Sequence, residues 1–254
     1  MRSLTLSLTL TLTAFGIPAA DLPTADAVLD RYVEVTGGKA AYEGLKTEMT
    51  SGVMEMKAQG IKGKMNGFRN AQNFSYNVVE IDGVGKIEEG FHEGIAWEKS
   101  AMGGPRVKTG EEKAFYMREA ILARDARWRD VYTKVELMGE DTVDGVACYK
   151  LLLTPKEGSR TETQFFEKVT GYRKRIAMVM STPMGDLPVE STLSDYKEFG
   201  GFKIPSKVST KMAGQELSVT ISSMEFNKEI PASRFVPPAD VKAIAAKVKA
   251  ASAK

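Results

Sequence analysis

Residues 53–83, VMEMKAQGIKGKMNGFRNAQNFSYNVVEIDG, contain the pattern that decides the fold. Short apolar-rich runs are separated by Gly, Asn or Asp, and Phe74, Tyr76 and Val78 occupy alternate positions within one run. A period of two is typical of a β-strand with one buried face, and Gly or Asn between runs is typical of tight turns. The stretch therefore predicts antiparallel strands joined by short hairpins.

The same pattern extends over most of the chain. Strand-like runs continue through GKIEEGF (85–91) and GIAWEKS (94–100), and they resume from about Val131 to Asn227 with turn signals between them. This predicts roughly ten or more antiparallel strands in sequence order. Neighbouring strands usually pair, and so long a meander must curl because strands twist.

Two helices are expected beside the strands. Residues 24–36, TADAVLDRYVEVT, have apolar side chains at helical spacing, Thr24 as a candidate N-cap and Gly37-Gly38 as a stop. Residues 109–124, TGEEKAFYMREAILAR, interrupt the strands, and Thr109 and Glu112 have the spacing of a capping box. Helices that cover one face of a curled sheet would leave a ligand cavity between the two layers.

The composition narrows the functional classes. The 254 residues are 43% hydrophobic and 27% charged, with a formal net charge of +2, which is ordinary for a globular protein. A near-neutral chain gives no electrostatic reason to expect nucleic acid as a partner. One Cys and one His exclude an intrachain disulfide and the common zinc patterns, so we expect no metal site and no cofactor. Cys148 lies among apolar neighbours and is expected to be a buried thiol.

The two ends of the chain read differently from the middle. Residues 1–20 have one positive charge, a Leu-rich run and small residues at their end, which is the order of a secretory signal peptide, although the alternating Thr residues could also mark a strand. The main domain is expected over residues 21–240. The Ala/Lys-rich residues 241–254 are either a terminal helix or a tail. The expected product is exported, most simply to a periplasm.

His92 does not have the surroundings of a catalytic residue. GFHEGIAWEKS (90–100) reads as strand, turn and strand, and the chain has no nucleophile or metal-ligand motif that His92 could serve. A hydrolase is therefore disfavoured, and no catalytic residue is expected. The nearby acidic residues are expected to be solvated: Glu88, Glu89, Glu93 and Glu98.

Methionine is unusually frequent, with 13 residues. Flexible, polarizable Met suits surfaces that adapt to varied apolar shapes, so these residues are either ordinary core or a pliable lining for acyl chains. Arg69, just before a turn, is either a solvated strand-end charge or a polar group at a cavity mouth.

The order of several segments resembles that of the LolA-type periplasmic lipoprotein carriers and the wider lipoprotein-sorting-like superfamily. The resemblance spans about residues 25–238, and the following segments carry it: GKMNGFRNAQNFSYNV (63–78), GFHEGIAWEKS (90–100), YKLLLTPKEG (149–158), TETQFFEKVTGYRKRIAMV (161–179) and SDYKEFGGFKIPSKV (194–208).

The resemblance implies an α+β fold: an unclosed, strongly curved antiparallel β half-barrel covered by helices. It also implies a non-enzymatic carrier of hydrophobic, acylated cargo, either lipoprotein or lipid, with membrane-bound donor and acceptor proteins as possible partners. By position Arg69 would be the latch of the helical lid, although the family usually has Pro after this Arg and this chain has Asn70. An alternative is an envelope sensor that binds an exported protein domain.

The expected site combines a lining and a lid. The residues expected to line the cavity are Met54, Met56, Phe68, Phe74, Trp97, Met178 and Met180. The 109–124 helix is the first candidate for the lid, with these apolar residues: Phe115, Met117, Ile121 and Leu122.

Overall fold

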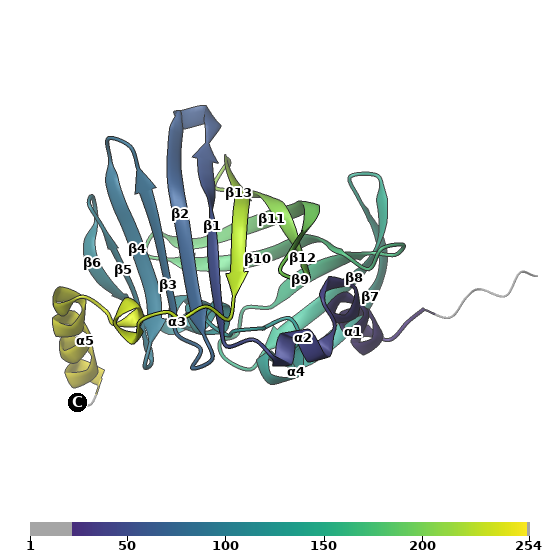
Figure 1. The fold of residues 1–254 in the computed structure, drawn as a ribbon, viewed down its shortest axis with the longest axis horizontal. Coiled ribbons are helices and arrows are strands. Elements are labelled where there is room, and N and C mark those ends of the chain that lie inside the picture. Colours follow the sequence, from purple (N-terminus) through teal and green to yellow (C-terminus); the bar gives the residue numbers. More distant parts are fainter. Residues whose placement is uncertain (1–21, 253–254) are drawn as a thin grey trace, which may run out of the picture.

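The computed structural model describes residues 22–252, and one antiparallel sheet of thirteen strands dominates it (Figure 1). The expected signal peptide lies outside the described residues. The strands are β1 (Thr47–Met56), β2 (Ile61–Asn70), β3 (Ser75–Ile81), β4 (Gly85–His92), β5 (Ile95–Ser100), β6 (Gly104–Lys108), β7 (Tyr132–Val143), β8 (Val146–Pro155), β9 (Glu162–Glu167), β10 (Arg173–Thr182), β11 (Gly185–Phe199), β12 (Phe202–Met212) and β13 (Gln215–Phe226).

The strand order is β6-β5-β4-β3-β2-β1-β13-β12-β11-β10-β9-β8-β7. Two meanders, β1–β6 and β7–β13, are thus joined through the pairing of β1 with β13. Strands β6 and β7 are the two ends of the order and do not pair with each other, so the sheet is open. This confirms the expected α+β half-barrel.

The helices lie at the ends and in the middle of the chain. They are α1 (Ala25–Thr36), α2 (Lys39–Glu43), α3 (Gly110–Glu119), α4 (Trp128–Val131) and α5 (Ala239–Ser252), with short 3₁₀ turns η1 (Lys57–Gln59) and η2 (Ala232–Phe235). The Thr24 hydroxyl accepts a hydrogen bond from the Ala27 amide at 3.1 Å, so the predicted N-cap of the first helix is confirmed. No helix within residues 22–252 is both long and apolar enough to cross a bilayer.

Contacts of α3 show how strongly the sheet curves. Helix α3 contacts β4 and β5 on one side and β10 on the other. Between β4 and β10 in the strand order lie β3, β2, β1, β13, β12 and β11. Because strands are about 4.8 Å apart, these two groups would be roughly 34 Å apart in a flat sheet. The sheet therefore bends around α3.

The largest core lies where α1, α2 and α4 cover the β7–β9 end of the sheet (Figure 1). The side chains of Leu151 and Leu153 on β8 are fully buried there, and the Tyr32 ring of α1 meets the Phe166 ring edge-on at 5.4 Å. The apolar positions of α1 that predicted an amphipathic helix are the ones that are buried. Burial of this stripe, rather than helix propensity, holds α1 in place.

The C-terminal segment folds back on the opposite face of the sheet. Of the two alternatives for the Ala/Lys-rich end, the structure shows a helix as far as Ser252: α5 packs along β5 and β6, and η2 contacts β3 and β4 (Figure 1). Phe235 and Val241 are buried against Tyr76 and Trp97.

Two local predictions for the 90–124 region had different outcomes. The β4–β5 connection is a two-residue turn with positive φ at Glu93 (46°) and Gly94 (79°), as expected, although His92 itself ends β4. The capping box was wrong, because the Thr109 side chain makes no cap hydrogen bond and Glu112 instead binds Arg106. Helix α3 ends at Glu119, so the predicted 109–124 helix was too long.

Replacing Leu151 by Ala should lower the free energy of unfolding by about 2–5 kcal/mol, because the side chain is fully buried and its removal leaves a cavity. Urea denaturation measures the change. Met138→Ala on the adjoining strand is the control, since that side chain is 56% exposed and its loss should change stability by less than about 0.5 kcal/mol. Equal effects of the two substitutions would contradict the assignment of this core.

Candidate functional site

The two faces of the sheet differ in polarity. We define the inner face as the one that contacts α3 through Phe91 and Ala96, and the outer face as the opposite one. Following the strand pairs from Phe91 across β3, β2 and β1 to β13 shows which residues share the inner face. Polar residues such as Asn77, Ser191 and Thr210 interrupt this face, but apolar residues predominate on it. The apolar residues are Met54, Met56, Ile61, Met65, Val79, Ile81, Ile87, Ile176, Met178, Met180, Leu187, Val189, Val208, Met212, Leu217, Val219 and Ile221.

Most of these inner-face side chains are only half-buried, and Val189 is the exception at 8% exposure. The outer face of the same strands instead carries polar residues: Glu55, Lys62, Lys64, Lys207, Ser209, Lys211, Glu216, Ser218 and Thr220. A strand that is polar outside and apolar inside normally has its apolar face covered. Here α3 covers part of that face and leaves the remainder with partial access to solvent.

The predicted lining residues divide between the two faces. Met54 and Met56 of β1 and Met178 and Met180 of β10 lie on the inner face, so the structure places these four on one surface. They come from opposite parts of the strand order, and the curvature of the sheet turns them toward the same side.

The three predicted aromatic residues do not join them. Phe68 and Trp97 point to the outer face, and Phe74 lies beside them, under the C-terminal segment. Trp97 pairs with Gly90, where an added Cβ would lie 2.9 Å from the indole Nε1. The glycine thus makes room for the indole on the outer face.

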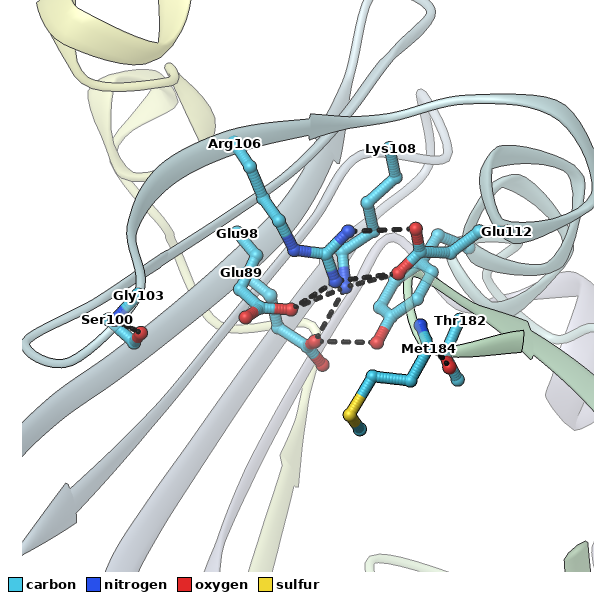
Figure 2. Close-up of polar contacts among 10 residues, drawn as sticks. Glu89, Glu98, Ser100, Gly103, Arg106, Lys108, Glu112, Thr182 and Met184 are labelled. Atoms are coloured by element: carbon cyan, nitrogen blue, oxygen red, sulfur yellow. Dashed lines mark hydrogen bonds and ion pairs between the residues drawn. The ribbon is translucent and has the colours of Figure 1, made fainter. Parts of the chain in front are cut away.

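A cluster of ionised side chains fixes the first turns of α3 to the sheet (Figure 2). The Lys108 ammonium is 1% exposed and lies 2.9 Å from the Glu98 carboxylate and 3.5 Å from those of Glu89 and Glu112. The Arg106 guanidinium joins Glu98 and Glu112 at 2.8 Å and 2.7 Å. Each carboxylate therefore shares its charge with a cation from β6.

The expectation that these acidic residues are solvated was therefore wrong for Glu89 and Glu98. It was also wrong for Glu88, which accepts a 2.6 Å hydrogen bond from the Tyr76 hydroxyl, while Glu93 is exposed as expected. Burial raises the pKa of the Glu98 carboxyl, but the hydrogen bonds and charges of Lys108 and Arg106 outweigh burial and hold this pKa below its ordinary 4.5.

A second set of contacts holds the opposite side of α3 to the β8–β9 loop. The buried Arg118 donates to the Glu157 carbonyl at 2.7 Å, and Glu111 accepts from the Ser159 amide and hydroxyl at 2.9 Å. Gly158 lies between them with φ of 83°, and a Cβ there would meet Glu111 at 2.7 Å. Helix α3 is thus bound to both rims of the half-barrel.

The C-terminal end of α3 meets Arg69. The Arg69 Nε donates to the Glu119 carbonyl at 2.9 Å, and its Nη1 binds the Glu48 carboxylate on β1. A cation at the last carbonyl of a helix also interacts favourably with the helix dipole. Of its two sequence interpretations, Arg69 is therefore not a solvated charge, because it joins the sheet to α3.

The four residues predicted to form the lid do not share the same surroundings in the structure. Met117, together with Tyr116, packs on Phe91 and Ala96 of the inner face, and Phe115 lies edge-on to Tyr116. Ile121 and Leu122 lie beyond the end of the helix, and Leu122 is 3% exposed.

One small cavity adjoins Arg69, and a second lies beside the first. One, of about 160 Å³, lies between Arg69, Ile121 and the inner-face residues Phe202 and Phe226. The other, of about 290 Å³, is lined by Tyr42, Leu45 and Ala123, which also line parts of the first, and it reaches Lys39 at the surface.

A buried polar group closes the far end of the inner face. The Arg173 guanidinium, 8% exposed, binds both oxygens of Asp125 at 2.8 Å and 3.1 Å and lies over the Tyr32 ring. Burial raises the pKa of Asp125, but the charge of Arg173 outweighs it and lowers this pKa. Cys148 is buried as expected, and burial raises the pKa of its thiol.

Sequence reasoning missed the Lys108 cluster, although signals were present. Arg106 and Lys108 share a face by period two, and Glu112 follows Lys108 by four residues. The cross-strand pairing of Arg106 with Glu98 needed the β5–β6 register, which one sequence does not fix.

Glu98→Gln should lower the free energy of unfolding at pH 7 by about 1–3 kcal/mol, because Lys108 and Arg106 lose a charged partner. A lowered carboxyl pKa stabilises the folded state above the unfolded-state pKa, and this contribution is lost as the pH falls through the folded-state pKa. The difference between the wild-type protein and the variant should therefore shrink below pH 4.5. Urea denaturation at several pH values measures it.

The exposed Glu93→Gln serves as control and should have no measurable effect at any pH. A wild-type-to-variant difference for Glu98→Gln that stays constant from neutral to acid pH would contradict the role of the Glu98 charge.

Comparison with known proteins identifies the fold. No family model matches the sequence, and no curated protein matches it. Among solved structures, a LolA superfamily protein from Nitrosomonas europaea is similar with a TM-score of 0.59 and 12% identity, over 85% of this chain and 99% of that one. A DUF1329 family protein from Desulfovibrio piger gives 0.58 and 17% identity, over 84% and 97%. A putative outer membrane lipoprotein-sorting protein domain from Vibrio parahaemolyticus gives 0.54 and 14% identity, over 83% and 97%. The chain therefore has a LolA-like fold.

Proposed function

We propose that this protein binds and carries a hydrophobic, acylated molecule in the cell envelope, with the inner face of the sheet as the binding surface and α3 as its lid. One observation carries the proposal: a broad apolar inner face, rich in methionine, whose side chains are only half-buried. The signal-peptide-like start supports export, and the LolA-like fold supports this class of cargo.

The energetics favour an apolar cargo. Each methylene group that leaves water for an apolar surface contributes about 0.8 kcal/mol, so an alkyl chain gains several kcal/mol along such a face. The four methionines at positions 54, 56, 178 and 180 can adapt to chains of different shape. A lipoprotein acyl chain or a free lipid has this chemistry, and membrane-bound donor and acceptor proteins would load and remove it.

For the inner face to open, α3 must lose the contacts that hold it to the sheet and to the β8–β9 loop. Moving α3 away from the sheet breaks the Glu112 contacts to β6, the Arg118 contact to the β8–β9 loop and the Arg69 contact to Glu119. These contacts are polar and water can replace them, whereas the Met117 and Ala120 contacts to Phe91 are apolar and a cargo chain can replace them. A bound acyl chain therefore lowers the free-energy cost of moving α3 away from the sheet.

Met178→Glu should weaken the binding of a fluorescent fatty acid by at least about tenfold, because it places a charge on the apolar surface. Val179→Glu is the matched control, since Val179 is the next residue on the same strand, points to the outer face and is 39% exposed. Titration of the fluorescence gives both affinities. Equal losses in the two variants would reject the inner face as the site.

Native mass spectrometry showing a bound protein domain and no lipid would instead favour the envelope sensor.

Arg69→Leu should release the same fluorescent fatty acid about tenfold faster, because α3 loses its C-terminal anchor. Stopped-flow competition with unlabelled fatty acid measures the release rate. Lys64→Leu, an exposed outer-face residue of the same strand, should leave the rate unchanged. An Arg69→Leu rate equal to that of the wild-type protein would reject the latch role.

A further inference from the structure

A cavity separate from the inner face lies between α5, the β4–β5 turn and the start of α3. Its volume is about 900 Å³, within the usual range for small-molecule sites. We call it the α5 cavity and define it by the residues that line it: Glu93, Gly94, Ile95, Val107, Lys108, Thr109, Gly110, Lys113, Lys242, Ala245, Ala246, Val248 and Lys249.

One face of α5 forms a wall of this cavity. Lys242, Ala245, Ala246 and Lys249 follow the i, i+3, i+4, i+7 spacing that places side chains on one side of a helix. Buried Val241 fixes the helix to the outer-face core, and the 2.6 Å pair between Lys99 and Asp240 fixes its first turn to β5. The N-terminal turn of α5, the helix that forms this side of the cavity, is therefore fixed to the sheet.

The charges around the α5 cavity are unbalanced. Lys113, Lys242 and Lys249 have no carboxylate partner among residues 22–252, and Asp240 is occupied by Lys99. Lys108 also lines the cavity, but its ammonium pairs with Glu98. The single acidic residue in the lining is Glu93.

Apart from the lysines, Glu93 and Thr109, the rest of the lining is apolar or glycine. Ile95 and Val107 come from β5 and β6, and Ala245 from α5. Lysines around an apolar hollow match a ligand with an anionic head and an alkyl chain, because the head neutralises the ammonium groups and the chain covers the apolar walls. A bare phosphate would use only the lysines.

We propose that the α5 cavity binds an anionic amphiphile, with its phosphate or carboxylate head at Lys113, Lys242 and Lys249 and its alkyl chain against Ile95, Val107 and Ala245. Because Lys113 belongs to α3, the bound head would contact the first turns of the same helix that covers the inner face. The site is distinct from the inner face and stands whether or not that face carries cargo.

Isothermal titration of the full-length protein with lysophosphatidylglycerol, below its critical micelle concentration, tests the proposal. Lys242→Glu and Lys249→Glu should each weaken binding at least about tenfold, because each replaces an attraction by a repulsion. Lys247→Glu is the matched control: it makes the same charge change on the same helix, but Lys247 does not line the cavity. Its affinity should stay within about twofold of the wild type.

Three further ligands identify which part of the amphiphile is recognised. Dodecanoate should bind at the same lysines, which would show that a carboxylate serves as the head, whereas its failure to bind would contradict the proposal for carboxylate heads. Inorganic phosphate should bind at least about tenfold more weakly than lysophosphatidylglycerol, because it lacks the chain. Lysophosphatidylcholine should also bind more weakly, because its head carries no net charge.

Several results would overturn the proposal. If inorganic phosphate binds as tightly as lysophosphatidylglycerol, the cavity binds an anion without recognising an alkyl chain. If all three lysine variants lose the same affinity, the ligand is attracted by the overall charge of the helix and not by this cavity. Ala245→Trp, which fills the cavity without a charge change, should also abolish the lysine-dependent binding, and full retention of that binding would contradict the site. Met178→Glu, which disables the inner face, should leave the lysine-dependent binding intact.

Discussion

The pairing of β1 with β13 is the constraint on which the rest of the structure depends. It joins two meanders into one continuous sheet, and the accumulated twist of so many strands bends that sheet until β4, β5 and β10 all reach α3. Curvature brings the β1 and β10 methionines to one side, although they lie far apart in the strand order. The inner face owes its shape to this pairing and its chemistry to the period-two pattern of the strands.

Helix α3 connects three parts of the molecule. Its underside packs on the inner face through Met117, its first turns belong to the Lys108 cluster, and its last carbonyl meets Arg69. Buried lysines are rarely tolerated without close partners, and Lys108 has three carboxylates around it. The contacts of α3 are thus polar at both ends and apolar in the middle.

The sequence was most informative where periodicity and turn residues are local. The helix that begins after Thr24, the hairpin at Glu93-Gly94 and the strand succession all followed from such patterns. Alternation shows which residues share a face but not which face is inside, and for this reason Phe68 and Trp97 were grouped with Met54. The outer face of β3–β6 is covered by η2 and α5, whose packing partners lie more than a hundred residues earlier in the chain. The charged clusters also depended on distant partners, since Arg173 and its partner Asp125 are 48 residues apart in the chain.

The central claim is that the inner face holds an alkyl chain, and locating such a chain tests it most directly. A crystal structure of the protein with 12-bromododecanoate gives the bromine position from its anomalous scattering. The account predicts bromine on the inner face, in van der Waals contact with Met54 or Met178 and beneath or beside α3. Bromine found solely in the α5 cavity or on the outer face, with the inner face unoccupied at saturating ligand, would contradict it.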